Sequence, residues 1–126
     1  LTEADAAFLP EQIDTTDAAH RQYVEEIFEK HARFGRSNFD YFYSAQCVWE
    51  EIMAESIAEH LDGGVMVALI GNGHIIEKFG VPNRAVDRTG ASMRTVYLAE
   101  SGRPVDLTSG DFIWVTPPST RNQRNR

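Results

Sequence analysis

The chain has 126 residues, of which 42% are hydrophobic, so its length and composition suit one compact domain with its own core. Its formal net charge of −7 argues against a nucleic-acid-binding surface, because phosphate recognition requires clustered lysine and arginine side chains. The single cysteine, Cys47, excludes an internal disulfide, and no apolar run approaches the ~20 residues of a membrane span. Attachment to a membrane would therefore need an anchor outside this sequence.

Two amphipathic helices are predicted in the first half of the chain. The segment Asp14–Asp17 offers N-cap side chains, and apolar residues then recur at helical spacing until a break near Gly35. A second apolar stripe, which includes Trp49, predicts a helix from about Tyr41 to Leu61. The opposite edge of this helix carries like charges at i, i+4 spacing: Glu51, Glu55 and Glu59. Because like charges repel unless water screens them, we expect this edge to face solvent.

The second half of the chain predicts strands. Val65–Ile70 is a continuous apolar run of strand length, which is typical of a strand buried on both faces. Two further strands are predicted at Ser92–Ala99 and Asp111–Thr116, and Pro82 predicts a short helix as far as Asp87 or Arg88. We therefore expect an α/β fold with two N-terminal helices packed on a small, mostly parallel three-stranded sheet.

The tetrapeptide Gly71-Asn72-Gly73-His74 follows the first predicted strand directly. The carboxyl ends of parallel strands open a crevice in which α/β sheets bind ligands. Glycines there can adopt positive φ and let the backbone approach a ligand, Asn72 tolerates the left-handed region, and His74 can serve as base, metal ligand or haem ligand. The alternative is a plain turn in which His74 makes local hydrogen bonds, because one histidine without partners specifies no reaction.

Arg84 is predicted in the first turn of the short helix that Pro82 begins. An arginine close to a histidine at a strand end can hold a carboxylate or a haem propionate with two hydrogen bonds. The alternative for Arg84 is a surface ion pair with Asp87 or Glu77.

Three polar residues share one side of the second predicted helix, because Tyr43, Gln46 and Glu50 are three and four residues apart. If this side faces the crevice, Glu50 can accept the Nδ1 proton of His74 or bind a metal ion together with it. Tyr43 can bind ferric haem through its phenolate, or it can simply pack among aromatic neighbours. The remaining histidines are expected to be ordinary surface residues: His20, His31 and His60.

Four blocks of sequence together resemble the ChaN-like family: Tyr43–Ala54, Ala68–His74, Gly80–Arg84 and Asp111–Pro117. Its bacterial members are described as iron-regulated, haem-binding lipoproteins, related to the Tiki and TraB proteins and the erythromycin esterases. The resemblance implies a haem site at a crevice or dimer interface, in the periplasm or on the outer membrane. Its candidate residues are the possible iron ligands Tyr43 and His74, the propionate partner Arg84, the neighbouring Asn72, and Glu50 behind the ligands.

The family also carries an earlier Gly-Glu-x-His motif, which has no counterpart between Leu1 and Leu61. The resemblance therefore implies the C-terminal half of a larger α/β domain, spanning residues 1–117. The polar composition of residues 118–126 predicts a disordered tail. An exposed sheet edge or apolar surface is then expected, where the missing N-terminal half docks or where the chain forms a homodimer.

Three functions follow as expectations. The first is a haem-binding protein of iron uptake. The second is an esterase-like or peptidase-like hydrolase, in which His74 and Glu50, together with the missing Gly-Glu-x-His motif, activate water directly or through a divalent metal ion on His74. The third is an interaction domain without a cofactor.

Overall fold

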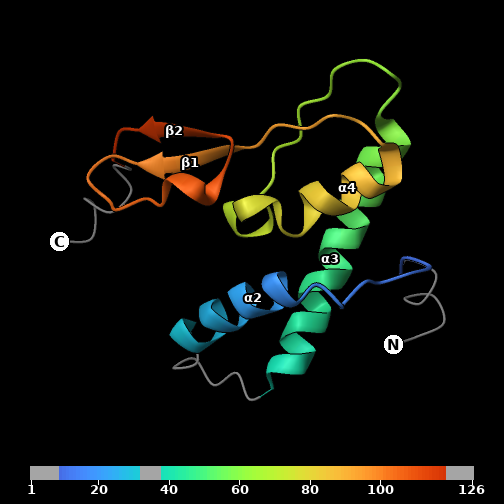
Figure 1. Cartoon of the computed structure of the whole chain (residues 1–126), viewed down its shortest axis with the longest axis horizontal. Coiled ribbons are helices and arrows are strands. Elements are labelled where there is room, and N and C mark those ends of the chain that lie inside the picture. Colours follow the sequence, from blue (N-terminus) through green and yellow to red (C-terminus); the bar gives the residue numbers. More distant parts are fainter. Residues whose placement is uncertain (1–8, 32–37, 119–126) are drawn as a thin grey trace.

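Figure 1 shows the computed structural model, which describes residues 9–31 and 38–118. In chain order the elements are α2 (Ala18–His31), α3 (Phe39–His60), η2 (Asn72–His74), η3 (Ile76–Lys78), α4 (Val81–Thr89), β1 (Val96–Glu100), η4 (Leu107–Ser109) and β2 (Phe112–Thr116), where η denotes a short 3₁₀ helix. Within the described ranges, each helix is too short or too polar to cross a lipid bilayer.

The helices begin where side chains can accept their free backbone N–H groups. Asp17 Oδ1 accepts hydrogen bonds from the backbone of Ala19 and His20, each at 3.0 Å, at the start of α2. Asn38 does the same for α3, accepting from the backbone of Tyr41 at 3.1 Å. The predicted second and third helices are confirmed as α3 and α4, and α2 confirms the first, whose expected end near Gly35 lies outside the described residues.

The long helix α3 is the centre of the molecule, since it packs against α2 near one end and against α4 near the other (Figure 1). Each contact has its own small core. The core between α2 and α3 contains Val24, Tyr43 and Cys47, and the core between α3 and α4 contains Ala54, Val81 and Ala85. Cys47 is fully buried.

The prediction of three strands is wrong, because the sheet has two strands within residues 9–31 and 38–118. β1 and β2 run parallel, in a register that pairs Val96 with Phe112 and Leu98 with Trp114. The apolar run Val65–Ile70 belongs to neither strand of the sheet, and the exposed fractions of Val65, Val67 and Leu69 are 99%, 82% and 95%. A buried strand needs neighbouring strands on both sides, and the described residues do not provide them for this run.

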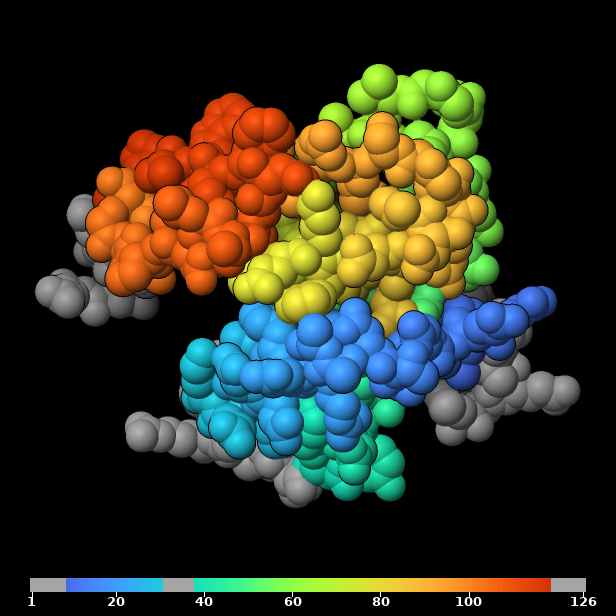
Figure 2. Space-filling view, viewed as in Figure 1, coloured from blue at the N-terminus to red at the C-terminus, as the bar shows by residue number. Residues whose placement is uncertain are grey.

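The helices also do not pack on the sheet as expected. The main packing of the helices is that of α3 against α2 and against α4, whereas the sheet lies to one side and meets the rest of the molecule through η3 and η4 (Figure 1). One face of the sheet remains exposed: Val96, Leu98, Phe112 and Trp114. In Figure 2 the yellow segment that carries η2 and η3 lies between α2 and the strands.

Candidate functional site around Glu50

Glu50 of α3 is a fully buried carboxylate that four side chains surround. Gln46 Nε2 donates a hydrogen bond to Oε1 at 2.7 Å, and His74 Nδ1 lies 3.1 Å from the same oxygen. The other oxygen, Oε2, lies 3.3 Å from His20 Nε2 and 3.6 Å from Arg84 Nε. A buried charge is stable only when such partners replace the water that it has lost.

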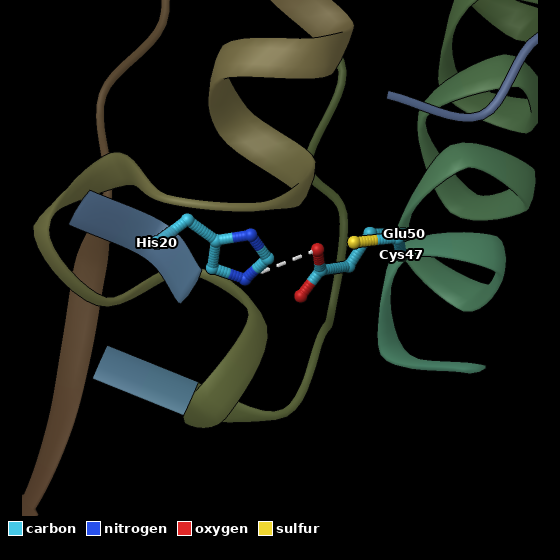
Figure 3. Close-up of side chains that lie close together, drawn as sticks. All are labelled: His20, Cys47 and Glu50. Atoms are coloured by element: carbon cyan, nitrogen blue, oxygen red, sulfur yellow. Dashed lines mark ion pairs between the residues drawn. The ribbon is translucent and has the colours of Figure 1, made fainter. Parts of the chain in front are cut away.

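The partners of Glu50 come from four separate parts of the chain. Gln46 precedes Glu50 by four residues, about one turn of α3, whereas His20 comes from α2, His74 from η2 and Arg84 from α4. Figure 3 shows the His20 ring directed from α2 toward the Glu50 carboxyl group, with Cys47 beside Glu50 on α3. The carboxylate therefore joins the segments whose mutual packing defines the helical part of the fold.

Gly80 lies directly against this carboxylate at the start of α4. Its φ angle is 68°, in the left-handed region that favours glycine. A Cβ atom at this position would lie 2.6 Å from both Cδ and Oε1 of Glu50, which is far inside van der Waals contact. The site therefore requires glycine here both for the backbone angle and for the space.

The hydrogen bonds around Glu50 decide its protonation state. Burial alone would raise its pKa, but the ion pair with His20 and the hydrogen bonds from His74 and Gln46 outweigh burial and lower the pKa to about 2. Glu50 is thus ionised at neutral pH.

The prediction that His20 lies on the surface is wrong. His20 is 1% exposed, and its ring packs 5.4 Å from that of Tyr43. Burial lowers the pKa of His20, but interactions with Cys47 and Glu50 outweigh it and raise the pKa to about 9. Its burial is predictable from the helical spacing, because His20 lies four residues before Val24 on the buried face of α2.

The raised pKa of His20 predicts a pH-dependent stability. The stabilisation from the imidazolium is fully present below the unfolded pKa of 6.5 and is lost as pH rises through about 9. The free energy of unfolding should fall by roughly 3 kcal/mol between about pH 6 and pH 10, as measured by urea denaturation. His20→Gln should flatten this dependence, and an equal fall in this variant would contradict the assignment.

His74 lies at the open side of the cluster, where its side chain is 28% exposed. Its contacts are made by Nδ1, which lies 2.8 Å from Gln46 Nε2 and 3.1 Å from Glu50 Oε1. The predicted contact between Glu50 and His74 is therefore present. The turn is also present, because the His74 backbone donates to the Gly71 carbonyl at 2.9 Å.

Asn72 connects this turn to the sheet. Its Nδ2 donates to the Leu98 carbonyl at 2.7 Å, and the Leu98 backbone N–H donates to its Oδ1 at 3.4 Å. Gly71, Asn72 and Gly73 tolerate the left-handed conformation, but none of them adopts it. Positive φ angles occur instead further along this loop, at Glu77, Lys78 and Gly80.

Tyr43 and Arg84 are both buried, and each makes hydrogen bonds within the chain. The Tyr43 hydroxyl donates to the Asp17 carbonyl at 3.3 Å, and burial raises the pKa of this phenol. Arg84 donates to the carboxylate of Glu51 and to the carbonyl of Asp14. The roles of Tyr43 as an iron ligand and of Arg84 as a propionate partner stay predictions. Either role would require the residue to give up the contacts described here.

The prediction that Glu51 faces solvent is wrong, whereas Glu55 and Glu59 are exposed. Glu51 is 2% exposed and forms ion pairs with Arg84 and Arg88. These arginines come from α4, which packs on this edge of α3. Glu51 therefore differs from Glu55 and Glu59, because its charge is paired with cations that are distant in the sequence.

Two small cavities approach the cluster from the side of α4. One of about 270 Å³ is lined by residues that include His20 and Arg84. The other, of about 380 Å³, is lined by residues that include Arg84 and Glu51. His74 lines neither cavity, so its exposed side belongs to a different face of the site.

A mixed α/β protein with a histidine held by a buried carboxylate is the class that this fold and site define. A protein-family profile described as "Haem-binding uptake, Tiki superfamily, ChaN" matches residues 1–85, which is more than half of the chain. The chain belongs to this family, as its resemblance predicts. Comparisons with curated proteins and with solved structures found no match.

Proposed function

We propose that this protein binds haem for iron uptake, with His74 as the axial ligand of the iron. The observation that carries the proposal is the partly exposed His74 ring, whose Nδ1 faces the buried carboxylate of Glu50. A carboxylate behind a ligating imidazole orients the ring and increases its basicity. With Nδ1 held in this way, Nε2 is the nitrogen that binds iron, as in proteins with a proximal histidine.

Exposed apolar residues next to the turn in sequence, and on the strand that Asn72 contacts, support an apolar ligand. Leu69, just before the turn, is 95% exposed, and Leu98, which Asn72 contacts, is 55% exposed. At Gly73 an added Cβ would meet no atom within 4 Å, so the backbone surface is open there. In this proposal the porphyrin lies against these apolar side chains, and Glu50 positions the ligand.

A haem bound on this open face needs cover on its second side. We place a second copy of this chain there, and the exposed apolar residues Val65 and Val67 supply part of the contact surface. Docking of an N-terminal half of the same domain is the alternative. An uptake role places the protein in the periplasm or on the outer membrane. Light scattering should show a dimer when hemin is added, and a hemin complex that stays monomeric would contradict this arrangement.

Titration with hemin tests the ligand directly. The wild-type protein should shift the Soret band at one hemin per chain, and His74→Ala should weaken binding by about tenfold or more because the axial bond is lost. His60→Ala is the matched control, since His60 is an exposed histidine at the end of α3. A Soret band that the wild type leaves unchanged, or equal affinity in His74→Ala, would contradict the proposal.

A hydrolase is the second candidate, and the same contact favours it. A histidine whose Nδ1 lies 3.1 Å from a carboxylate is oriented to act as a general base, alone or with a divalent metal ion on its other nitrogen. A screen with ester and peptide substrates distinguishes the two candidates. Hydrolysis that His74→Ala abolishes would support the enzyme, whereas activity insensitive to this substitution would exclude it.

A further inference from the structure

Three buried side chains on the inner side of Glu50 bring different metal-binding atoms together. His20, Cys47 and Glu50 are 1%, 0% and 0% exposed, and their ligand atoms all lie within 4.8 Å of one another. Cys47 and Glu50 are three residues apart and therefore share one face of α3. Figure 3 shows His20 facing them from α2.

Two of the candidate ligand atoms lack a hydrogen bond. His20 Nε2 and Glu50 Oε2 are fully buried and, although they lie 3.3 Å apart as an ion pair, neither has a hydrogen-bond partner within the described chain. Buried polar atoms in proteins are almost always hydrogen-bonded or in contact with water or an ion. We propose that His20, Cys47 and Glu50 form a closed site for one divalent transition-metal ion, with zinc the best fit.

The distances suit tetrahedral zinc. Zinc bonds of about 2.0–2.1 Å to nitrogen, 2.0–2.2 Å to oxygen and 2.3 Å to sulfur imply about 3.3 Å between N and O ligands, and about 3.5 Å from sulfur to either. His20 Nε2 and Glu50 Oε2 are already 3.3 Å apart. Since all three ligand atoms lie within 4.8 Å, the sulfur of Cys47 must approach by at most roughly 1.3 Å. A water molecule would complete the tetrahedron.

The donor set also selects the class of ion. Thiolate and imidazole prefer zinc, cobalt and similar ions over magnesium or calcium, which take oxygen ligands. Binding releases the proton of Cys47 Sγ and the Nε2 proton of the His20 imidazolium, so two protons leave as one divalent cation enters. The total charge beside Arg84 therefore does not change, and this arginine keeps its ion pair with Glu51.

The metal site and the proposed haem site use different oxygens of one carboxylate. The metal contacts Oε2, and His74 keeps Oε1, which lies 3.1 Å from its Nδ1. The ion would join α2 to α3 at the base of the site. The metal proposal therefore does not depend on haem binding.

Titration of the reduced, tag-free chain with Co²⁺ alone tests the site. We expect one equivalent to produce a thiolate-to-cobalt charge-transfer band together with the intense visible bands of tetrahedral cobalt, and Zn²⁺ to displace it. Cys47→Ser should abolish the charge-transfer band, whereas His74→Gln and His60→Gln should retain it. Absence of the band in the wild type, or its persistence in Cys47→Ser, would overturn the proposal.

A second measurement needs no variant. Bound Zn²⁺ should slow alkylation of Cys47 in the wild-type chain under mildly denaturing conditions, and equal rates with and without Zn²⁺ would overturn the site. Circular dichroism shows whether Cys47→Ser is folded. If this variant does not fold, the alkylation rates of the wild-type chain with and without Zn²⁺ test the site instead. Failure of the haem proposal appears separately, in the Soret band and its response to His74→Ala.

Discussion

Replacing Glu50 with glutamine is expected to lower the free energy of unfolding by about 3–5 kcal/mol, the usual cost of removing one member of a buried ion pair. The substitution keeps the shape of the side chain and removes its charge. The buried His20 imidazolium then loses the carboxylate 3.3 Å from its Nε2, and His74 loses the anion 3.1 Å from its Nδ1. Urea denaturation near neutral pH measures the loss.

Glu55→Gln is the matched control for this substitution, because Glu55 lies on the same helix but is exposed. Its effect should stay within about 0.5 kcal/mol, as is usual for surface substitutions. If Glu50→Gln cost no more than this control, the carboxylate would not be the centre of the buried cluster.

Gly80→Ala should cost about 2–5 kcal/mol of stability, the sum of a left-handed backbone cost of about 1–2 kcal/mol and an overpacking cost of about 1–3 kcal/mol. The φ angle of Gly80 is 68°, and the new Cβ would lie 2.6 Å from the Glu50 carboxyl group. Moving Glu50 aside would also disturb its contact with His74, so hemin affinity should fall with stability. Urea denaturation measures the first effect and hemin titration the second.

Gly90→Ala measures the cost of a side chain at positive φ where no contact with Glu50 exists. Gly90 ends α4 with a φ of 64° and a ψ of 6°, whereas the ψ of Gly80 is −120°, and an added Cβ at Gly90 would meet nothing within 4 Å. This control should therefore show only the backbone cost of about 1–2 kcal/mol. Equal losses in the two variants would mean that the contact with Glu50 is unimportant.

The helices were predictable because their signals are local. Asp17 and Asn38 accept the first backbone N–H groups of α2 and α3, and Pro82 lies in the first turn of α4. Each signal lies within a few residues of the helix that it starts, so no knowledge of distant contacts was needed.

The sheet was less predictable because strand pairing is not local. Phe112–Thr116 was anticipated nearly to its ends, and Val96–Glu100 overlaps the predicted strand. The run Val65–Ile70 has the composition of a buried strand but remains exposed, since the backbone of a strand needs neighbours whose presence the run itself does not encode.

The site divides in the same way. The spacing on α3 predicts that Gln46 and Glu50 share one side of the helix. That side faces the turn that carries His74, so the contact between Glu50 and His74 is present. The burial of His20 and Glu51 was not predicted, because it depends on how α2 and α4 pack against α3. The close contact of Gly80 with Glu50 is likewise not predictable from local sequence, since the two residues are thirty positions apart in the chain.

Restoring the iron ligand from solution is the most direct test of the proposed role of His74. In His74→Gly the missing imidazole leaves the Glu50 carboxylate and Gln46 beside the gap that free imidazole can fill. We expect the hemin complex of this variant to lose the wild-type Soret spectrum and to regain it when imidazole is added. A wild-type spectrum in His74→Gly without imidazole would show that another side chain binds the iron.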